Sequence, residues 1–342
     1  MRQIGIDLGS STVKIIILSD SEVERQWIEP HYGNIADTLV LGLQECGVAD
    51  GTELCSVTGG NAYFLKDILP QSCLTDEIPA ITEGVRTLVP NAACIMEIGS
   101  QSSRFITDLN SPAPRFSVSG HCAGGTGSFF EDQMSRLGMR IEDYSREVEK
   151  ATSIPRLSGR CAVFAKTDII HRQQEGVTIP DILNGLCYAM IRNYKAVIIK
   201  NLPVRKPVVF CGGVACNSGV AKAIRDTFGL SKEDLIIPKD FRYTAAIGAA
   251  KDAAAAVDFA SFCESLANVK PAVAGVSDPL VLRLGTELHD PAASGVIPEE
   301  GCALGIDIGS TSTDLVLVSP SGALIDYQYL RTAGNPEKAV RN

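Results

Sequence analysis

The sequence predicts an α/β fold built from two related lobes. Residues 3–18 and 93–107 share one design, in which an apolar strand ends in an acidic residue, a turn of small residues follows, and a second strand returns. A third part is the apolar strand at 207–210, which runs into a glycine-rich turn and then a helix. Because two such hairpins occur in order, we expect a duplicated core with lobe I at about 1–90 plus a C-terminal helix and lobe II at about 91–245.

The elements around the hairpins follow from hydrophobic periodicity and turn residues. The first hairpin continues into a strand at 23–28, and an amphipathic pattern predicts a helix at 34–46. A strand at 53–58 ends in two glycines, and a helix is expected at 79–88. The later elements are, in order, helices at 126–137, 141–149, 161–175 and 179–202, the strand at 207–210, a helix at 217–227, a strand at 235–237 and an alanine-rich helix at 243–256.

Composition narrows the class of protein. The chain has 342 residues, is 45% hydrophobic and 21% charged, and has a formal net charge of -9 without any Lys/Arg-rich run, which argues against nucleic-acid binding. Asp7 interrupts the apolar start and no apolar run approaches about 18 residues, so we expect no membrane span and a cytoplasmic protein. Eleven cysteines without a CxxC pair make disulfides improbable, and most should be small buried hydrophobes.

The C-terminal part repeats the beginning of the chain. Residues 303–318, ALGIDIGSTSTDLVLV, follow the opening IGIDLGSSTVKIIILS nearly residue for residue. We therefore interpret 1–260 as one domain, 261–301 as a linker and 302–342 as the truncated start of a second repeat from a longer tandem protein. A single hairpin cannot bury its own sheet, so this piece should be disordered or lean on a neighbour.

The first hairpin turn suits a phosphate. Glycine allows backbone N–H groups to approach an anion closely, and hydroxyl groups add donors. The residues that supply these groups are Gly9, Ser10, Ser11 and Thr12. Asp7 at the strand end could hold Mg²⁺ through water, and Lys14 could contact a phosphate as a point charge. An ordinary tight hairpin is the alternative.

The other two parts complete a nucleotide site. The second turn supplies Glu97 as a catalytic carboxylate and Gly99 and Ser100 as nucleotide contacts. It also supplies Gln101, which could orient an attacking water. The glycine-rich segments supply Gly125, Thr126, Gly127, Gly212, Gly213, Val214 and Asn217 as further nucleotide contacts, and Glu131 could bind the ribose or be a solvated helix carboxylate. In actin-like ATPases two hairpins clamp the phosphates and a GG turn holds adenosine. The three parts therefore predict an actin-like ATPase fold of the ribonuclease H-like (ASKHA) type, with ATP or ADP and Mg²⁺ bound; no Walker or Rossmann motif is present.

Two cysteines stand at the starts of expected helices. A helix N-terminus stabilises a thiolate, and Cys122 and Cys161 would each gain from it. Two thiolates cannot complete a four-thiolate cluster, but two copies of the chain can. The chemistry thus predicts a dimer with a [4Fe–4S] cluster at its interface; packing of both cysteines is the alternative. His121 is interpreted as a neighbour of the cysteine and not as a ligand.

The motifs HCAGGTGSFFEDQ and GRCAVFAKTDII resemble the two cluster-binding motifs of the BadF/BadG/BcrA/BcrD ATPase family, and most closely those of 2-hydroxyglutaryl-CoA dehydratase activators. The resemblance covers about residues 1–260. It implies an ATP-dependent homodimeric activator of a 2-hydroxyacyl-CoA dehydratase, with a [4Fe–4S] cluster held by Cys122 and Cys161 of both copies. It further implies ferredoxin or flavodoxin as the electron donor, and ATP hydrolysis coupled to one-electron reduction of the dehydratase.

The second turn departs from that family. The usual DIGGQDSK is EIGSQSSR here, so Glu97, Ser100 and Ser102 replace Asp, Gly and Asp, which puts turnover in question. Three alternatives stay open. One is a sugar or small-acid kinase of the same fold, with Asp108 as the candidate base. The others are a nucleotide-dependent regulatory module without catalysis and an ATPase pair of a benzoyl-CoA reductase.

Overall fold

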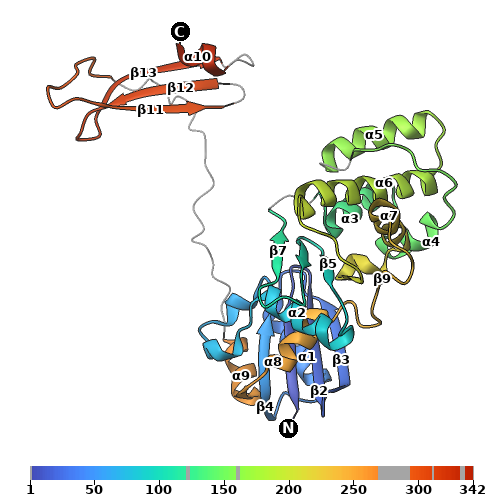
Figure 1. Ribbon diagram of the computed structural model, residues 1–342. Helices are drawn as coiled ribbons and strands as arrows, with labels where there is room; N and C mark the ends of the chain where they lie inside the picture. The colour runs from blue at the N-terminus through green and yellow to red at the C-terminus, as the bar shows by residue number, and fades with distance from the viewer. Residues whose placement is uncertain are drawn as a thin grey trace. The chain divides into compact units, whose positions relative to one another are not determined.

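The computed structural model describes residues 2–120, 124–158, 162–268, 293–309, 312–331 and 336–341. Contacts within the chain divide it into two units, Met1–Pro271 and Ala272–Asn342, and each is described by itself. The first unit contains two sheets and a group of helices, which can be told apart in Figure 1.

The first sheet of this unit has the strand order β10–β4–β1–β2–β3. Its strands are β1 (Gln3–Leu8), β2 (Thr12–Ser19), β3 (Glu22–Pro30), β4 (Thr52–Thr58) and β10 (Ala255–Asp258). Strand β1 pairs antiparallel with β2 and parallel with β4. Its apolar side chains are fully buried, and helices α1 (Ile35–Glu45) and α9 (Phe259–Ala267) contribute to the same core.

The second sheet has the corresponding order β7–β6–β5–β8–β9, except that β9 runs parallel to β8 whereas β10 runs antiparallel to β4. Its strands are β5 (Cys94–Ile98), β6 (Ser103–Thr107), β7 (Arg115–Val118), β8 (Val208–Cys211) and β9 (Leu235–Ile236). Strand β5 pairs antiparallel with β6 and parallel with β8, as β1 does with β2 and β4. The expectation of two related lobes, each opened by a hairpin, is confirmed.

Two helices cross backbone to backbone next to the first sheet. They are α2 (Glu77–Leu88) and α8 (Thr244–Asp252), which lie side by side in Figure 1. A Cβ atom at Gly84 would lie 1.8 Å from the Thr244 carbonyl oxygen, and one at Gly248 would lie 1.8 Å from the Ala80 carbonyl oxygen. Only glycine permits this approach, because any other side chain would have to displace backbone.

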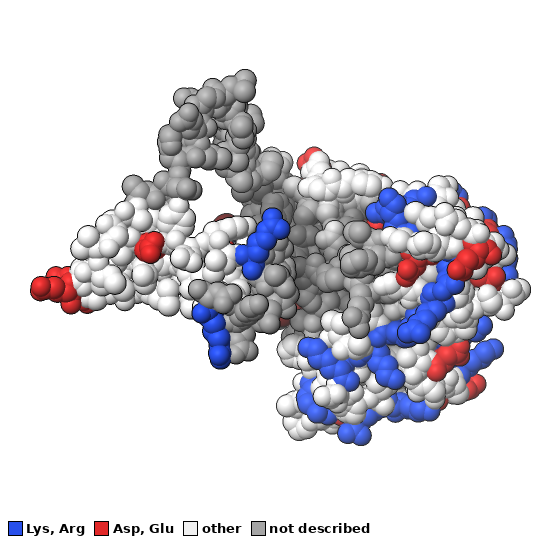
Figure 2. Space-filling view, turned by 90° about the horizontal axis from the view of Figure 1, so that it is seen from above, with Lys and Arg blue, Asp and Glu red and all other residues white. Residues whose placement is uncertain are grey.

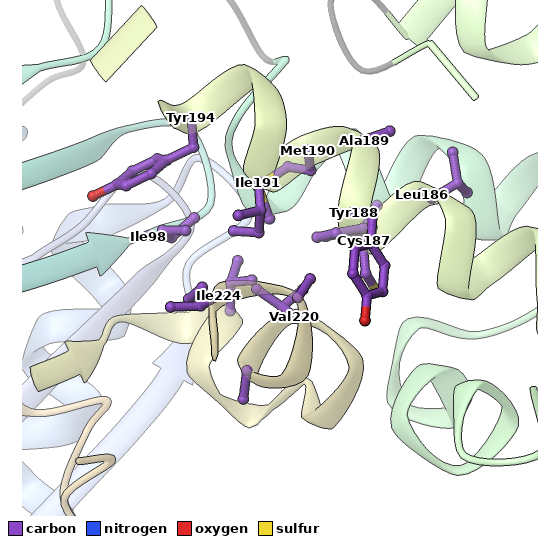
Figure 3. Packing of buried hydrophobic residues seen from close by; sticks show 14 of the residues in the cluster. Ile98, Leu186, Cys187, Tyr188, Ala189, Met190, Ile191, Tyr194, Val220 and Ile224 are labelled. Atoms are coloured by element: carbon purple, nitrogen blue, oxygen red, sulfur yellow. The ribbon is translucent and has the colours of Figure 1, made fainter. Parts of the chain in front are cut away.

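A group of helices covers the second sheet. They are α3 (Gly127–Arg136), α4 (Tyr144–Val148), α5 (Ala162–Gln174), α6 (Ile179–Tyr194) and α7 (Ser218–Phe228). Helix α6 is buried on nearly all sides because it lies in the middle of this group. Figure 3 shows its side chains facing Val220 and Ile224 of α7 and Ile98 of β5. The predicted helix 179–202 ends early, since α6 passes into a π-helical turn at Lys195–Ile199 and Lys200 takes a φ of 52°.

Three local expectations were incomplete or wrong. The predicted helix 243–256 ends at Asp252, and Ala255–Asp258 forms β10 instead, because these residues pair with the free edge of β4. Sheet pairing thus overrides the helix propensity of alanine. The segment interpreted as a linker from residue 261 begins inside α9, whose Phe262 and Leu266 are buried in the first unit. Strand β7 was not predicted.

The second unit contains a meander that copies the first hairpin. Its elements are β11 (Ala303–Ile308), β12 (Ser312–Val318), β13 (Leu324–Arg331) and α10 (Pro336–Arg341). Ala303 pairs with Val318 as Gln3 pairs with Leu18, so the register is the same 300 residues later. We expected disorder or support from a neighbour; the described strands form a regular sheet, and Leu304, Ile306 and Ile308 are about half exposed.

The cysteines described by the structure agree with the composition. Those that are buried are Cys46, Cys55, Cys73, Cys94, Cys187 and Cys211. Burial raises the pKa of the Cys187 thiol to about 12, so this thiol stays protonated and packs as a small apolar group. Among the described residues no helix is long and apolar enough to cross a membrane.

Candidate nucleotide-binding site

The first turn, Gly9–Thr12, is closed by a hydrogen bond from the Gly9 N–H to the Thr12 carbonyl at 3.0 Å. Two side chains hold it from outside: Asn61 Nδ2 donates to the Gly9 carbonyl at 2.7 Å, and His31 Nε2 lies 3.2 Å from the same oxygen. The Gly33 N–H donates to His31 Nδ1, which assigns the proton to Nε2. Sequence analysis missed His31 and Asn61, because neither is near the turn in the sequence.

Asp7 and Lys14 form an ion pair beside this turn. They are cross-strand neighbours on β1 and β2, and Lys14 Nζ lies 2.7 Å from Asp7 Oδ2. Asp7 is 8% exposed, so the lysine compensates a largely buried carboxylate. The structure thus places the predicted magnesium carboxylate and the predicted phosphate lysine together, with the lysine bound to Asp7.

The second turn meets the first. The Gly99 N–H donates to the Ser102 carbonyl at 2.8 Å, which closes the second turn in the same way. The Ser11 hydroxyl donates to the Ser100 hydroxyl at 2.8 Å and joins the two turns directly. Gln101 is exposed at the tip of the second turn. Two turns 89 residues apart therefore bring their serine hydroxyl groups together in one place.

Helix α3 begins on the second turn. The Gly127 N–H donates to the Gly99 carbonyl and the Ser128 N–H donates to the Ser100 carbonyl, both at 2.8 Å. These N–H groups are among those that a helix start leaves unpaired, so the turn caps the helix. Thr126, at the N-cap position, and Gly125 are buried here. Glu131, on the first turns of α3, is exposed.

The GG turn lies against the same place. Gly212 has a φ of 86°, and a Cβ there would lie 2.5 Å from the Ile98 carbonyl and 3.0 Å from Glu97 Oε1. Gly213 has open space around its Cα, and Val214 approaches Gly127. Asn217 has a structural role that sequence analysis did not assign: its Oδ1 accepts hydrogen bonds from two N–H groups at the start of α7.

Glu97 is buried beside these turns and paired with Arg104. Arg104 Nη1 lies 2.7 Å from Glu97 Oε2, and Arg104 Nη2 lies 2.6 Å from Glu77 Oε1. Burial raises the pKa of the Glu97 carboxyl, and the adjacent Arg104 guanidinium counters this. Sequence analysis missed Arg104, although Glu97 and Arg104 stand opposite each other in the β5–β6 register.

The predicted cluster ligands, Cys122 and Cys161, lie outside the described residues, as does His121. The helices that follow them are described: α3 starts at Gly127, and α5 starts at Ala162, directly after Cys161. These two helices contact each other. Both motifs thus lead into neighbouring helices of one lobe, an arrangement that fits a pair of thiolate donors. Elsewhere in the described part, three or more metal-ligating side chains do not converge on a common point.

The segment before Cys161 is anchored by Asp181 of α6. Asp181 Oδ1 accepts hydrogen bonds from the backbone N–H groups of Thr152 at 2.7 Å and Ser153 at 2.6 Å, and Oδ2 accepts one from the Thr178 hydroxyl. Burial raises the pKa of the Asp181 carboxyl, but these hydrogen bonds outweigh burial and lower it below its usual value.

Asp181→Ala should lower the free energy of unfolding by about 1–3 kcal/mol at pH 7, because two backbone donors lose their acceptor. The folded-state pKa is lowered, so this stabilisation is complete above the unfolded pKa of about 3.9 and disappears as the pH falls through the folded pKa. Urea unfolding at several pH values tests this, with the exposed Asp67→Ala as the control. An equal difference from the unsubstituted chain at pH 7 and at pH 3 would contradict it.

Surface charge is uneven on the first unit. Lys and Arg outnumber Asp and Glu in residues 91–245, although the whole chain has 40 acidic and 31 basic residues. Figure 2 shows Lys and Arg in several groups on the face of this unit that it presents. A protein partner that meets the second lobe therefore meets a more basic surface than the net charge suggests.

Comparison with known proteins settles the family. The sequence model described as the BadF/BadG/BcrA/BcrD ATPase family matches residues 4–253. The chain belongs to this family. The activator of lactoyl-CoA dehydratase from Anaerotignum propionicum is 28% identical over 256 residues, which cover 73% of this chain and 96% of that relative. The resemblance that the two cysteine motifs indicated is confirmed.

Solved structures agree for the fold. The Acidaminococcus fermentans (R)-2-hydroxyglutaryl-CoA dehydratase component A is 25% identical and superposes with a TM-score of 0.67, covering 78% of this chain and 99% of its own. The activator of the 2-hydroxyisocaproyl-CoA dehydratase from Clostridium difficile, with bound ADPNP, gives 0.64 at 24% identity, covering 79% and 99%. The actin-like ATPase fold is confirmed.

Proposed function

We propose that this ATPase-family chain is the activator of a 2-hydroxyacyl-CoA dehydratase and couples ATP hydrolysis to one-electron reduction of that enzyme. The observation that carries the proposal is the junction of the second turn with α3. Two backbone hydrogen bonds tie the Gly99 and Ser100 carbonyls to the start of the helix that follows Cys122. A nucleotide that shifts this turn must also shift that helix.

In the nucleotide site, the backbone N–H and hydroxyl groups of the two turns would bind the phosphates. Asp7 would hold Mg²⁺ through water, and Lys14 would then be free to leave Asp7 for a phosphate oxygen. Gln101 would orient the attacking water, and Gly212 and Gly213 would support adenosine. The ADPNP bound to the structurally similar Clostridium difficile activator supports a nucleotide in this fold.

Cys122 and Cys161 of two copies of the chain would supply four thiolates to a [4Fe–4S] cluster, which provides a low-potential one-electron carrier when bound. The chain's own part is to move α3 and α5 between arrangements that the nucleotide binds with different affinity. Ferredoxin or flavodoxin would be the electron donor, and the dehydratase the acceptor. The names of the curated relatives support that acceptor.

The kinase alternative is weakened by Asp108. Arg205 and Arg115 both bind its carboxylate at 2.6 Å, and their hydrogen bonds hold the pKa of Asp108 below its usual value. A carboxylate engaged in this way is a poor general base. The second candidate function is a nucleotide-dependent regulatory module. The second turn favours it, because Glu97, Ser100 and Ser102 stand where the family usually has Asp, Gly and Asp.

The experiment is anaerobic purification followed by iron analysis and EPR of the dithionite-reduced protein. We expect about four iron atoms per two chains and the signal of a reduced cluster. Cys122→Ala and Cys161→Ala should each abolish both, whereas Cys302→Ala, an exposed cysteine of the second unit, should not. A colourless chain after anaerobic reconstitution would overturn the activator and favour the regulatory module.

A further inference from the structure

Arg104 connects the nucleotide site to two other elements. Its guanidinium binds Glu97 of β5 with one nitrogen and Glu77 of α2 with the other, at 2.7 and 2.6 Å. Its backbone carbonyl accepts a hydrogen bond from the Tyr194 hydroxyl of α6 at 2.6 Å. The Arg104 side chain is only 8% exposed. One residue of β6 therefore joins β5, α2 and α6.

The division of the guanidinium between two carboxylates is informative. Arginine often binds one carboxylate with both nitrogens, which gives the strongest single pair. Here each nitrogen serves a different element, so a shift of either carboxylate changes the position of the other. A lysine, with one ammonium as a point charge, would lose the planar fork that keeps the two carboxylates apart at a fixed spacing.

On one side, Arg104 fixes Glu97 against the nucleotide turns. Glu97 Oε1 would lie 3.2 Å from a Cβ at Gly99 and 3.0 Å from one at Gly212, so this carboxylate lies between the second turn and the GG turn. Because Glu97 is buried, its orientation depends on its charged partner. Arg104 thus sets the direction of a carboxylate that faces both turns.

On the other side, Arg104 holds the first residue of a rigid helix. Glu77 begins α2, and about two turns further along Gly84 meets α8 backbone to backbone. At Gly84 and Gly248 the two helices meet through backbone atoms and not through side chains that could change rotamer. A displacement of Glu77 is therefore carried along α2 to the crossing with α8.

We propose that Arg104 is a positioning residue that orients Glu97 toward the bound nucleotide and reports the nucleotide state to α2 through Glu77. This rests on the proposed function in one respect, namely that the nucleotide binds between the two turns; it does not depend on the iron–sulfur cluster. When a nucleotide binds, the Glu97 carboxylate shifts and the Arg104 guanidinium shifts with it. The local stability of the first turn of α2 then changes.

The test combines hydrogen exchange, nucleotide affinity and ATP hydrolysis in the full chain. Glu77→Gln removes the ion pair between Arg104 and α2 and keeps the Arg104–Glu97 pair. We expect its ADP affinity to stay within about threefold, its kcat to fall about tenfold through misplacement of Glu97, and the ADP-dependent change in exchange at the first turn of α2 to vanish. Glu83→Gln makes the same change on the same helix at a carboxylate without an ion pair to Arg104, and should match the unsubstituted chain.

Arg104→Lys separates positioning from folding. It keeps the charge near Glu97, so the chain should fold and bind ADP, yet the exchange response of α2 should be lost as in Glu77→Gln. An unchanged exchange response in either variant, or no ADP-dependent change at α2 in the unsubstituted chain, overturns the inference. A chain that shows the expected responses but binds no iron supports the inference and refutes the activator.

Discussion

Gly84→Ala and Gly248→Ala are each expected to lower the free energy of unfolding by about 3 kcal/mol. Replacing a glycine inside a helix by alanine normally stabilises a protein by about 1 kcal/mol. Here the added methyl would lie 1.8 Å from a backbone carbonyl oxygen of the facing helix. Because neither atom belongs to a movable side chain, α2 and α8 would have to separate, and the packing between them would be lost.

Thermal and urea unfolding followed by circular dichroism measure this effect. Gly60→Ala is the control, since a Cβ at Gly60 meets no atom within 4 Å. We expect the control to unfold with the unsubstituted chain and both helix variants to unfold at clearly lower temperature and denaturant concentration. A midpoint equal to or above that of the unsubstituted chain would show that the helices do not cross at these glycines.

Asp7→Asn is expected to reduce ATP hydrolysis about 100-fold or more, because the site loses the carboxylate that would hold Mg²⁺, and the cation would stabilise the transferring phosphate. The substitution replaces one carboxylate oxygen by an amide nitrogen and therefore keeps the size of the side chain. Backbone N–H groups of the turns stay in place, so ADP affinity should change much less than kcat. The loss of the ion pair leaves Lys14 without its partner, and the thermal midpoint should be recorded alongside.

The repeat supplies a matched control for this prediction. Asp307 occupies the position of Asp7 in the copied hairpin, with the same strand register. Asp307→Asn should leave phosphate release unchanged, because the turns that we assign to the nucleotide belong to the first unit. Hydrolysis by Asp7→Asn within about threefold of the unsubstituted chain would remove Asp7 from the proposed machinery.

The parts of the site that lie within one hairpin could be predicted from sequence. Strand, turn and strand are local, so the positions of Asp7, Lys14 and the Gly9 turn follow from alternation and small residues. Glu97 opposite Arg104 is equally local, and cross-strand pairing would have revealed it. The two glycine-rich segments were also placed correctly before their helices, because glycine punctuates structure strongly.

The contacts between hairpins could not be predicted in this way. The Ser11–Ser100 hydrogen bond depends on how the two lobes pack, and the bond from Gly127 to Gly99 depends on how α3 packs on the second turn within one lobe. Nothing in the local pattern encodes either distance. The link from Arg104 to Glu77 is of the same kind. Strand β10 shows a different limit: four residues of an alanine-rich segment were taken into the sheet because an edge was available.

The copied hairpin keeps the strand register of the original but replaces its cross-strand Asp–Lys pair by two aspartates. Lys14 of the first copy corresponds to Asp314 of the second, which stands directly opposite Asp307. The first hairpin is neutral at this cross-strand position, and the second carries two adjacent negative charges, which repel. Register is set by the apolar positions, so the charged ones were free to diverge. The same strand register thus sets a lysine beside the carboxylate of Asp7 and, 300 residues later, a second carboxylate beside Asp307.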